Sequence, residues 1–222
     1  KRAGPVVFVS AGIHGDEVIG VEIVRRILRT ELNTLRGTLI CVPVVNAFGF
    51  HNHSRYMPDR RDLNRSFPGN EDGSLAARLA HIFLTEIVDR SDLGVDLHTA
   101  AIHRTNLPQV RVAEGEDELF RLAQIFGAPV VLRAPLREGT LRGEARARGV
   151  HMLLYEAGEA LRFDEVAVRT GVMGILRVLH DRGMLPKRAV SRAKTPSVLC
   201  RSSRWIRAPQ GGLFRAFINA GE

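Results

Sequence analysis

Two side chains that can bind a metal ion stand three residues apart where an apolar run of the sequence ends. The run PVVFVSA covers residues 5–11, and His14 and Glu17 follow it in the motif HGDE. A pattern of apolar residues typical of a helix begins directly afterwards. Asp16 and Glu17 also suit the first turn of that helix, where the helix dipole favours acidic side chains. A metal site and a simple helix start therefore stand as alternatives.

A third candidate ligand, His98, ends the strand-like run at residues 92–98. Parallel sheets bind ligands at the carboxyl ends of their strands, so His98 is expected near the HGDE motif. A hydrolytic zinc site takes about three protein ligands, commonly two His and one carboxylate, and keeps one position open for water. His14, Glu17 and His98 make such a set. Asp96 lies two residues before His98, on the same side of the strand, and is a candidate to orient it.

Hydrolysis also needs a base that takes a proton from water and passes it to the leaving amine. Glu156 ends another apolar run, at residues 150–156. Partial burial there would raise the pKa of its carboxyl group toward neutrality. Glu156 is therefore the candidate for the general base, and Glu159, which follows a Gly and is expected to point outward, is its neighbouring competitor.

A long polar stretch, residues 46–73, shows no helix or strand periodicity. Loops of such length in a compact domain are commonly functional or disordered. Arginine suits both a developing oxyanion and a substrate carboxylate, because its guanidinium is a charged, fork-shaped donor. The stretch supplies five candidate residues: Arg55, Arg60, Arg61, Asn64 and Arg65.

Strands and helices are predicted to alternate along the chain. This order predicts an α/β fold with a mainly parallel or mixed sheet and helices on both faces. The expected strands are residues 5–11, 38–45, 92–98, 129–133 and 150–156. The expected helices are residues 16–30, 74–89 (with Ser74 as N-cap), 116–127, 139–148 and 164–183.

The character of the sequence changes after about residue 186. The later stretch SRWIRAPQGGLFRAF is punctuated by Gly and Pro and has a β-like composition. We therefore expect a catalytic domain over residues 1–186 and the incomplete start of a β-rich C-terminal domain over residues 187–222.

Composition and charge narrow the class of protein and of partner. The chain has 222 residues, 45% of them hydrophobic and 25% charged, and a formal net charge of +8. No apolar run reaches the roughly 18 residues of a membrane span, and no signal peptide is recognised. The two cysteines form no CxxC pattern, so a reducing, cytoplasmic location is expected. The arginines are scattered, which disfavours a nucleic-acid partner. A positive field that attracts a small anionic substrate explains the charge equally well, and genomic codon bias explains it without any function.

Four motifs together resemble the succinylglutamate desuccinylase/aspartoacylase family, relatives of the zinc carboxypeptidases. The resemblance covers roughly residues 5–183. The motifs are HGDE (14–17), R-Y followed by DLNRSFPG (55–69), DLHT (96–99) and YEAG (155–158).

The resemblance implies one zinc ion per chain, bound by His14, Glu17 and His98. It implies Glu156 as general base and then acid, and Arg55 as the residue that polarises the scissile carbonyl. It also implies that Asn64 and Arg65 hold the substrate carboxylate, and that a C-terminal β domain shapes the pocket. The sequence MPDRR after Tyr56 is longer than in the shorter aspartoacylases. The oxyanion contact therefore stays open between Arg55, Arg60 and Arg61.

The leading hypothesis is a zinc-dependent hydrolase that cleaves the amide bond of an N-acyl amino acid or a similar small carboxylate. A zinc carboxypeptidase acting on short peptides is the alternative within the enzyme class. A non-catalytic metal- or nucleic-acid-binding protein is the alternative from another class. A homo-oligomer stays open.

Overall fold

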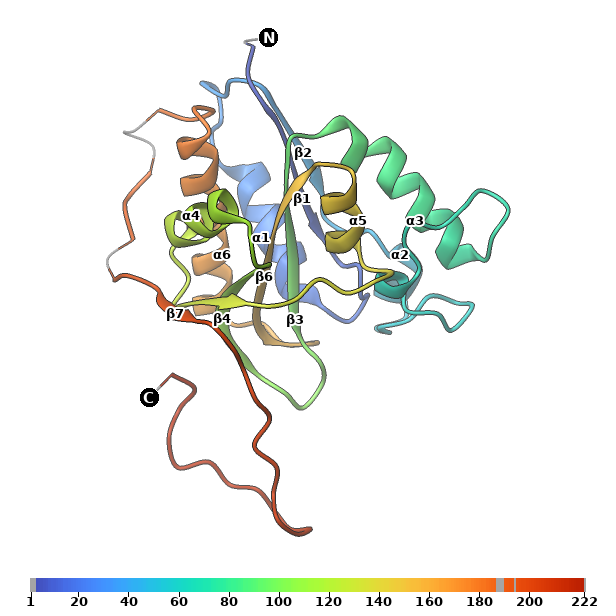
Figure 1. Cartoon of the computed structure of the whole chain (residues 1–222), viewed down its shortest axis with the longest axis vertical. Helices are drawn as coiled ribbons and strands as arrows, with labels where there is room; N and C mark the ends of the chain where they lie inside the picture. The colour runs from blue at the N-terminus through green and yellow to red at the C-terminus, as the bar shows by residue number, and fades with distance from the viewer. Residues whose placement is uncertain (1–2, 187–189, 194, 222) are drawn as a thin grey trace.

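The core of the molecule is a mixed β-sheet with helices on both faces (Figure 1). The computed structural model describes residues 3–186, 190–193 and 195–221. Its strands are β1 (Val6–Ala11), β2 (Thr38–Val42), β3 (Leu93–Ala100), β4 (Asn106–Val112), β5 (Val130–Arg133), β6 (His151–Glu159) and β7 (Val198–Cys200). Within the described residues these seven strands form one sheet in the order β2-β1-β3-β6-β4-β5-β7. All neighbours are parallel except β4 and β6, which confirms the predicted mainly parallel sheet.

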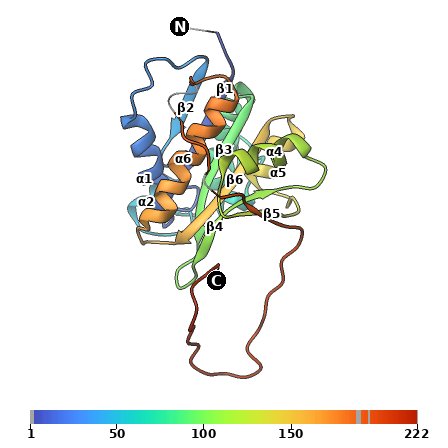
Figure 2. The same cartoon turned by 90° about the vertical axis from the view of Figure 1, so that its left-hand side faces the viewer.

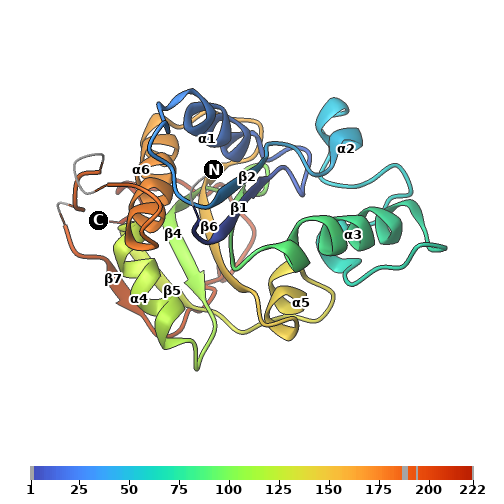
Figure 3. The same cartoon turned by 90° about the horizontal axis from the view of Figure 1, so that it is seen from above.

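Helices cover the sheet on both sides, as predicted (Figures 1 and 3). One face carries α1 (Val18–Arg29), α4 (Asp117–Phe126) and α6 (Glu165–Asp181). The other carries α3 (Leu75–Glu86) and α5 (Leu141–Ala147). Apolar side chains of each helix set pack on the sheet in a separate core. Strand β3 lies between the two cores and is buried along its whole length, as expected of a parallel strand covered on both faces.

The strands that carry His98 and Glu156 are longer than predicted. Strand β3 continues past His98 to Ala100, and β6 continues past Glu156 to Glu159. The extensions pair with each other after a register shift, with Ala100 opposite Glu159. His98 and Glu156 therefore lie within rigid strands near their carboxyl ends, not at their last residues.

The helix after HGDE begins later than the predicted residue 16. Helix α1 begins at Val18, and its N-cap residue, Glu17, makes no side-chain capping bond. Its buried residues follow a helical stripe that faces the sheet. The interpretation of Asp16 and Glu17 as acidic residues of the first helical turn is therefore wrong. By contrast, Ser74 accepts a hydrogen bond from the Ala77 backbone, which confirms it as the N-cap of α3.

Two parts of the chain were not anticipated. Strand β4 was missed because Pro108 interrupts its sequence, NLPQVRV, and proline within a run argues against a central strand. The stretch 46–73 contains a short helix, α2 (Ala47–His51), and a single 3₁₀ turn, η1 (Leu63–Arg65). Asn46 caps α2 by accepting a hydrogen bond from Gly49.

The C-terminal part first returns to the catalytic sheet and then leaves it. Strand β7 pairs in parallel with β5 at the sheet edge. Residues 201–221 contain no helix or strand and form a long exposed loop beyond β7 (Figure 2). The predicted boundary at residues 186/187 adjoins residues 187–189, which lie outside the described residues. The C-terminal β domain stays a prediction.

Among the described residues, no helix combines the length and the apolar character that a membrane crossing requires. Cys41 and Cys200 are free thiols.

Candidate metal centre and active site

The structure brings the three predicted metal ligands together. His14 follows β1, Glu17 precedes α1, and His98 comes from β3, the neighbour of β1 in the sheet. The Glu17 carboxylate lies between the two imidazoles, with Oε1 2.7 Å from His14 Nδ1 and Oε2 2.9 Å from His98 Nδ1. One donor atom from each residue lies within 4.8 Å of the others, and all three side chains are buried. We refer to these three residues as the His-Glu-His cluster.

The outer nitrogen of each histidine is held by an aspartate. His98 Nε2 lies 2.6 Å from Asp96 Oδ2, and Ser10 donates a hydrogen bond to the other oxygen of Asp96. This confirms the predicted contact between Asp96 and His98. His14 Nε2 lies 3.0 Å from Asp62 Oδ1. Both imidazoles therefore turn Nδ1 toward the cluster, in the arrangement by which carboxylates orient metal-binding histidines in proteins.

The electrostatics of the cluster fit a bound cation. Burial would raise the pKa of Glu17, but His14 and His98 hold it far below its usual value. Burial would lower the pKa of His98, but Asp96 and Glu17 raise it well above the usual value. The buried carboxylates thus favour positive charge at the cluster. The Nδ1 atoms of the two histidines converge with the carboxylate oxygens of Glu17. Two His and one Glu match the donor set of a zinc site.

Asp62 and Arg55 bind the stretch 46–73 to the cluster. Arg55 Nη2 lies 3.0 Å from Asp62 Oδ2, and Nη1 lies 3.5 Å from Glu17 Oε1. The other two candidate arginines lie elsewhere: Arg60 is exposed in a left-handed turn, and Arg61 is 64% exposed with Asp59 3.9 Å away. Of the three arginines left open by the sequence, Arg55 is the one beside the cluster.

Glu156 stands next to the cluster because of the strand register. In the parallel pairing of β3 with β6, Glu156 lies opposite His98, so both side chains emerge from the same face of the sheet. The Glu156 side chain is only 16% exposed. Burial raises the pKa of its carboxyl group, and Arg111 and His98 oppose this shift. Asn106 donates a hydrogen bond to Glu156 Oε2 at 2.6 Å, and Arg111 Nη2 lies 2.8 Å from the same oxygen.

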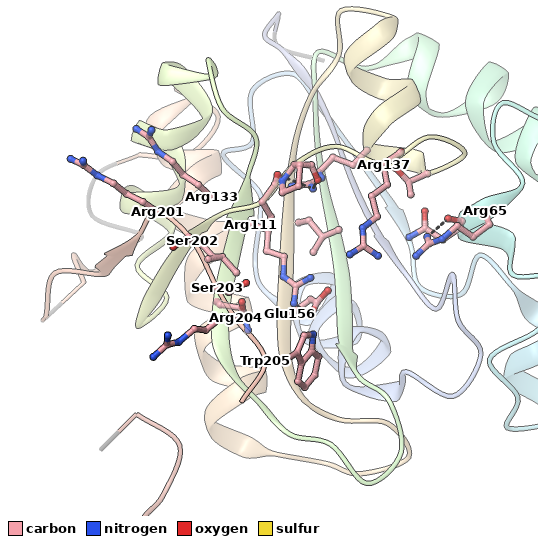
Figure 4. Close-up of a pocket in the computed structure, with 18 residues that line it drawn as sticks. Arg65, Arg111, Arg133, Arg137, Glu156, Arg201, Ser202, Ser203, Arg204 and Trp205 are labelled. Atoms are coloured by element: carbon pink, nitrogen blue, oxygen red, sulfur yellow. Dashed lines mark hydrogen bonds and ion pairs between the residues drawn. The ribbon is translucent and has the colours of Figure 1, made fainter. Parts of the chain in front are cut away.

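Glu156 also lines a cavity of about 640 Å³ with a strongly basic wall (Figure 4). Arg111 points to Glu156, whereas Arg133 and Arg201 point away from it (Figure 4). Seven arginines contribute to this wall: Arg65, Arg111, Arg133, Arg137, Arg142, Arg201 and Arg204. The His-Glu-His cluster is not part of the lining, so Glu156 is the residue that joins cavity and cluster.

The two predicted carboxylate-binding residues, Asn64 and Arg65, both line this cavity. Asn64 is buried, and its Oδ1 accepts a hydrogen bond from the Leu141 backbone at the start of α5. Its side-chain oxygen thus anchors the loop, and its amide nitrogen is the group that can donate to a ligand. Arg65 is exposed and donates to the Asn64 backbone carbonyl.

Three contact residues escaped the sequence-based prediction. Asp62 belongs to the DLNR motif, but only the fold shows that this segment reaches His14. Asn106 and Arg111 lie on the missed strand β4. The available signal was the alternation of polar and apolar residues in QVRV (109–112), and Pro108 obscured it.

Gly15 has no side chain, and this allows the HGDE turn to pack directly on the stretch 46–73. A Cβ atom added to Gly15 would fall on the backbone at Gly49 and Phe50, at less than 2.5 Å from both. The turn that carries His14 and Glu17 is thus pressed against α2 without an intervening side chain.

A sequence profile of the succinylglutamate desuccinylase/aspartoacylase catalytic domain matches residues 3–182. The chain belongs to the succinylglutamate desuccinylase/aspartoacylase family. This confirms the resemblance drawn from HGDE, DLNRSFPG, DLHT and YEAG.

Solved structures of the succinylglutamate desuccinylase/aspartoacylase family share the fold. A succinylglutamate desuccinylase/aspartoacylase from Rhodobacter sphaeroides is 28% identical, with a TM-score of 0.86. A succinylglutamate desuccinylase from a Silicibacter species is 26% identical, with a TM-score of 0.87. Each match covers 100% of this chain and 70% of the other chain.

A curated relative is the N-alpha-acetyl-L-2,4-diaminobutyric acid deacetylase of Halomonas elongata, which is 32% identical over 139 residues. The match covers 60% of this chain and 41% of the deacetylase. The chain thus spans less than half the length of the curated relative that it matches.

Replacing Gly15 by Ala should lower the free energy of unfolding by about 3 kcal/mol, because the added methyl meets backbone that cannot rotate away. Urea unfolding followed by circular dichroism measures the change. Gly211→Ala is the control, since a Cβ there meets nothing within 4 Å. Equal stability of the Gly15 variant and the wild type would contradict the close packing of HGDE on α2.

Proposed function

We propose that this chain is a zinc-dependent deacylase that cleaves the amide bond of a small, anionic N-acyl amino acid. The observation that carries the proposal is the position of Glu156. Its carboxyl group stands beside the His-Glu-His cluster through the register of β3 and β6, and it also faces the basic cavity. Family membership and the deacetylase relative support the same class of reaction.

His14, Glu17 and His98 would hold the zinc ion, with Asp62 and Asp96 orienting the two histidines. When bound, zinc supplies Lewis-acid activation of water and of the acyl carbonyl. Arg55, beside Glu17, adds a positive charge close to the carbonyl oxygen and stabilises the charge that develops there.

Glu156 would carry the proton during the reaction. Its carboxylate accepts a proton from the attacking water and returns it to the nitrogen of the leaving amino group. The raised pKa favours the first transfer, because a carboxyl group with a higher pKa is a better base, and it keeps the group protonated until the amine leaves.

The arginine-lined cavity selects the substrate by charge. Arg65 would pair with the substrate carboxylate, with the amide nitrogen of Asn64 as a second donor. The deacetylase relative acts, by its name, on an N-acetylated amino acid, which fits the proposed class. The preponderance of arginine in the lining favours an anionic side chain or acyl group over the amine of diaminobutyric acid.

The same groups could serve a carboxypeptidase, and the deacetylase relative favours the deacylase over that alternative. A purely metal-binding protein would have no use for Glu156 beside the cluster. Cytoplasmic location and a homo-oligomeric state stay expectations.

The wild type should contain about one zinc ion per chain, and His14→Ala should lose it, because two ligands alone hold zinc poorly. Elemental analysis of protein purified without a polyhistidine tag measures the content. His81→Ala is the matched control, since His81 pairs with Glu71 on the surface, away from the cluster. Absence of zinc from folded wild type, even after reconstitution, would contradict the metal site.

Replacing Glu156 by Gln should keep the zinc and lower kcat by at least about a hundredfold, because an amide cannot accept the proton. Hydrolysis is measured on a panel of N-acetyl and N-succinyl amino acids, with zinc content checked in the same samples. A kcat within about tenfold of wild type would remove Glu156 from the role of base.

Replacing Arg65 by Ala should raise KM for carboxylate substrates by about tenfold or more and change kcat much less, since the carboxylate contact is the same in ground and transition states. Arg148→Ala is the control, because Arg148 pairs with Asp89 away from the cavity. An unchanged KM in Arg65→Ala would show that another cavity arginine binds the carboxylate.

A further inference from the structure

Strand β4 contains an irregularity that changes which of its side chains face Glu156. Asn106 lies opposite Gly158, whereas Gln109 lies opposite Glu156. The chain thus advances three residues on β4 against two on β6, which is a β-bulge with one extra residue on β4. Pro108 lies within the irregular part, where the missing N–H of a proline is tolerated.

The bulge places Asn106 and Arg111 on the same face. They are five positions apart in the sequence, and in a regular strand an odd number of positions would point the two side chains to opposite faces. The extra residue reverses this alternation, so that Asn106 lies on the face that also holds Arg111 and Glu156. Without the bulge, only one of the two could reach the carboxylate.

Both side chains bind the same oxygen of Glu156. The Asn106 Nδ2–Glu156 Oε2 distance is 2.6 Å, and the Arg111 Nη2–Glu156 Oε2 distance is 2.8 Å. Two donors from one strand fix the rotation of the carboxyl group, since turning it would break both bonds. The second oxygen, Oε1, carries neither contact.

We propose that Asn106 and Arg111 are positioning residues that fix Oε2 of Glu156 and reserve Oε1 for the proton of the reaction. This inference rests on the proposed function of Glu156 as the general base. The two residues act through Glu156, and a misplaced base lowers the rate of the chemical step more than it weakens substrate binding.

Asn106 separates this role from simple attraction of an anionic substrate. Arg111 is a cation on the cavity wall, so its loss could also weaken substrate binding. Asn106 is neutral, and its hydrogen bond to Glu156 gives it a part in the reaction that does not depend on charge. If removing the Asn106 side chain and removing the Arg111 side chain lower kcat to the same extent, the shared contact with Oε2 of Glu156 is the cause.

The kinetic test compares Asn106→Ala, Arg111→Ala and Arg111→Lys in the zinc-loaded protein. Both alanine variants should lose about 10- to 100-fold in kcat with little change in KM, and Lys should recover part of the loss because it restores one charged donor. Arg148→Ala is the matched control: Arg148 also pairs with a carboxylate, and both arginine side chains are 32% exposed. A kcat within about twofold of wild type in both alanine variants, or a rise in KM alone, would overturn the proposal.

A second readout does not depend on activity. The side-chain carboxyl carbon of Glu156 is labelled with carbon-13, assigned by loss of its signal in Glu156→Gln, and titrated by NMR. His14, Glu17, His98 and Arg142 also act electrostatically on Glu156, and the variants leave all four in place. Loss of either donor to the charged form should raise the midpoint of the titration, with no change in Arg148→Ala.

The two readouts separate the failure of this inference from that of the proposed function. If the midpoint moves in the alanine variants but the wild type hydrolyses no N-acyl amino acid, the contact with Glu156 is retained and the deacylase proposal is overturned. An unmoved midpoint in both alanine variants would overturn the positioning role, whatever the activity.

Discussion

The burial of one carboxylate between two imidazoles determines the arrangement of this site. Glu17 is almost fully buried, and it can stay charged only because His14, His98 and the Thr99 backbone N–H surround it. These groups come from the turn after β1 and from the adjacent strand β3. The parallel pairing of β1 with β3 is therefore a condition for the cluster, and the arrangement of Asp96 and Asp62 follows from it.

The candidate site residues lie on two parts of the sheet that differ in their charged side chains. On the side of β1 and β3, buried carboxylates hold the histidines in place. On the side of β4 and β5, arginines face a cavity and leave the substrate space positively charged. Strand β6 lies between these two parts and presents Glu156 to both. In the proposed deacylase, a proton carrier at that boundary reaches water near the cluster and an amine in the cavity without a large movement of the chain.

The sequence was sufficient for the part of the site that depends on regular strands. Apolar runs marked β1, β3 and β6, and polar residues at their carboxyl ends had to converge, so His14, Glu17 and His98 could be named together. Contacts created by irregular backbone were not accessible in this way. Strand β4 contains Pro108 and a bulge, and its pairing with β6 is antiparallel, so neither its existence nor its side-chain alternation follows from a periodic pattern. The approach of Asp62 to His14 depends on the path of a long loop that no local rule determines.

The return of β7 to the edge of the sheet has a consequence for how specificity can change. Arg201, Arg204 and Trp205 follow that strand and form part of the cavity wall, far in sequence from every residue of the His-Glu-His cluster. The His-Glu-His cluster and this portion of the wall thus lie in separate stretches of the chain. In the proposed deacylase, mutations in the later stretch can reshape substrate preference without altering the residues that would hold the metal. Under the proposed function, such a division lets one hydrolytic core diversify by exchange of the sequence that follows it.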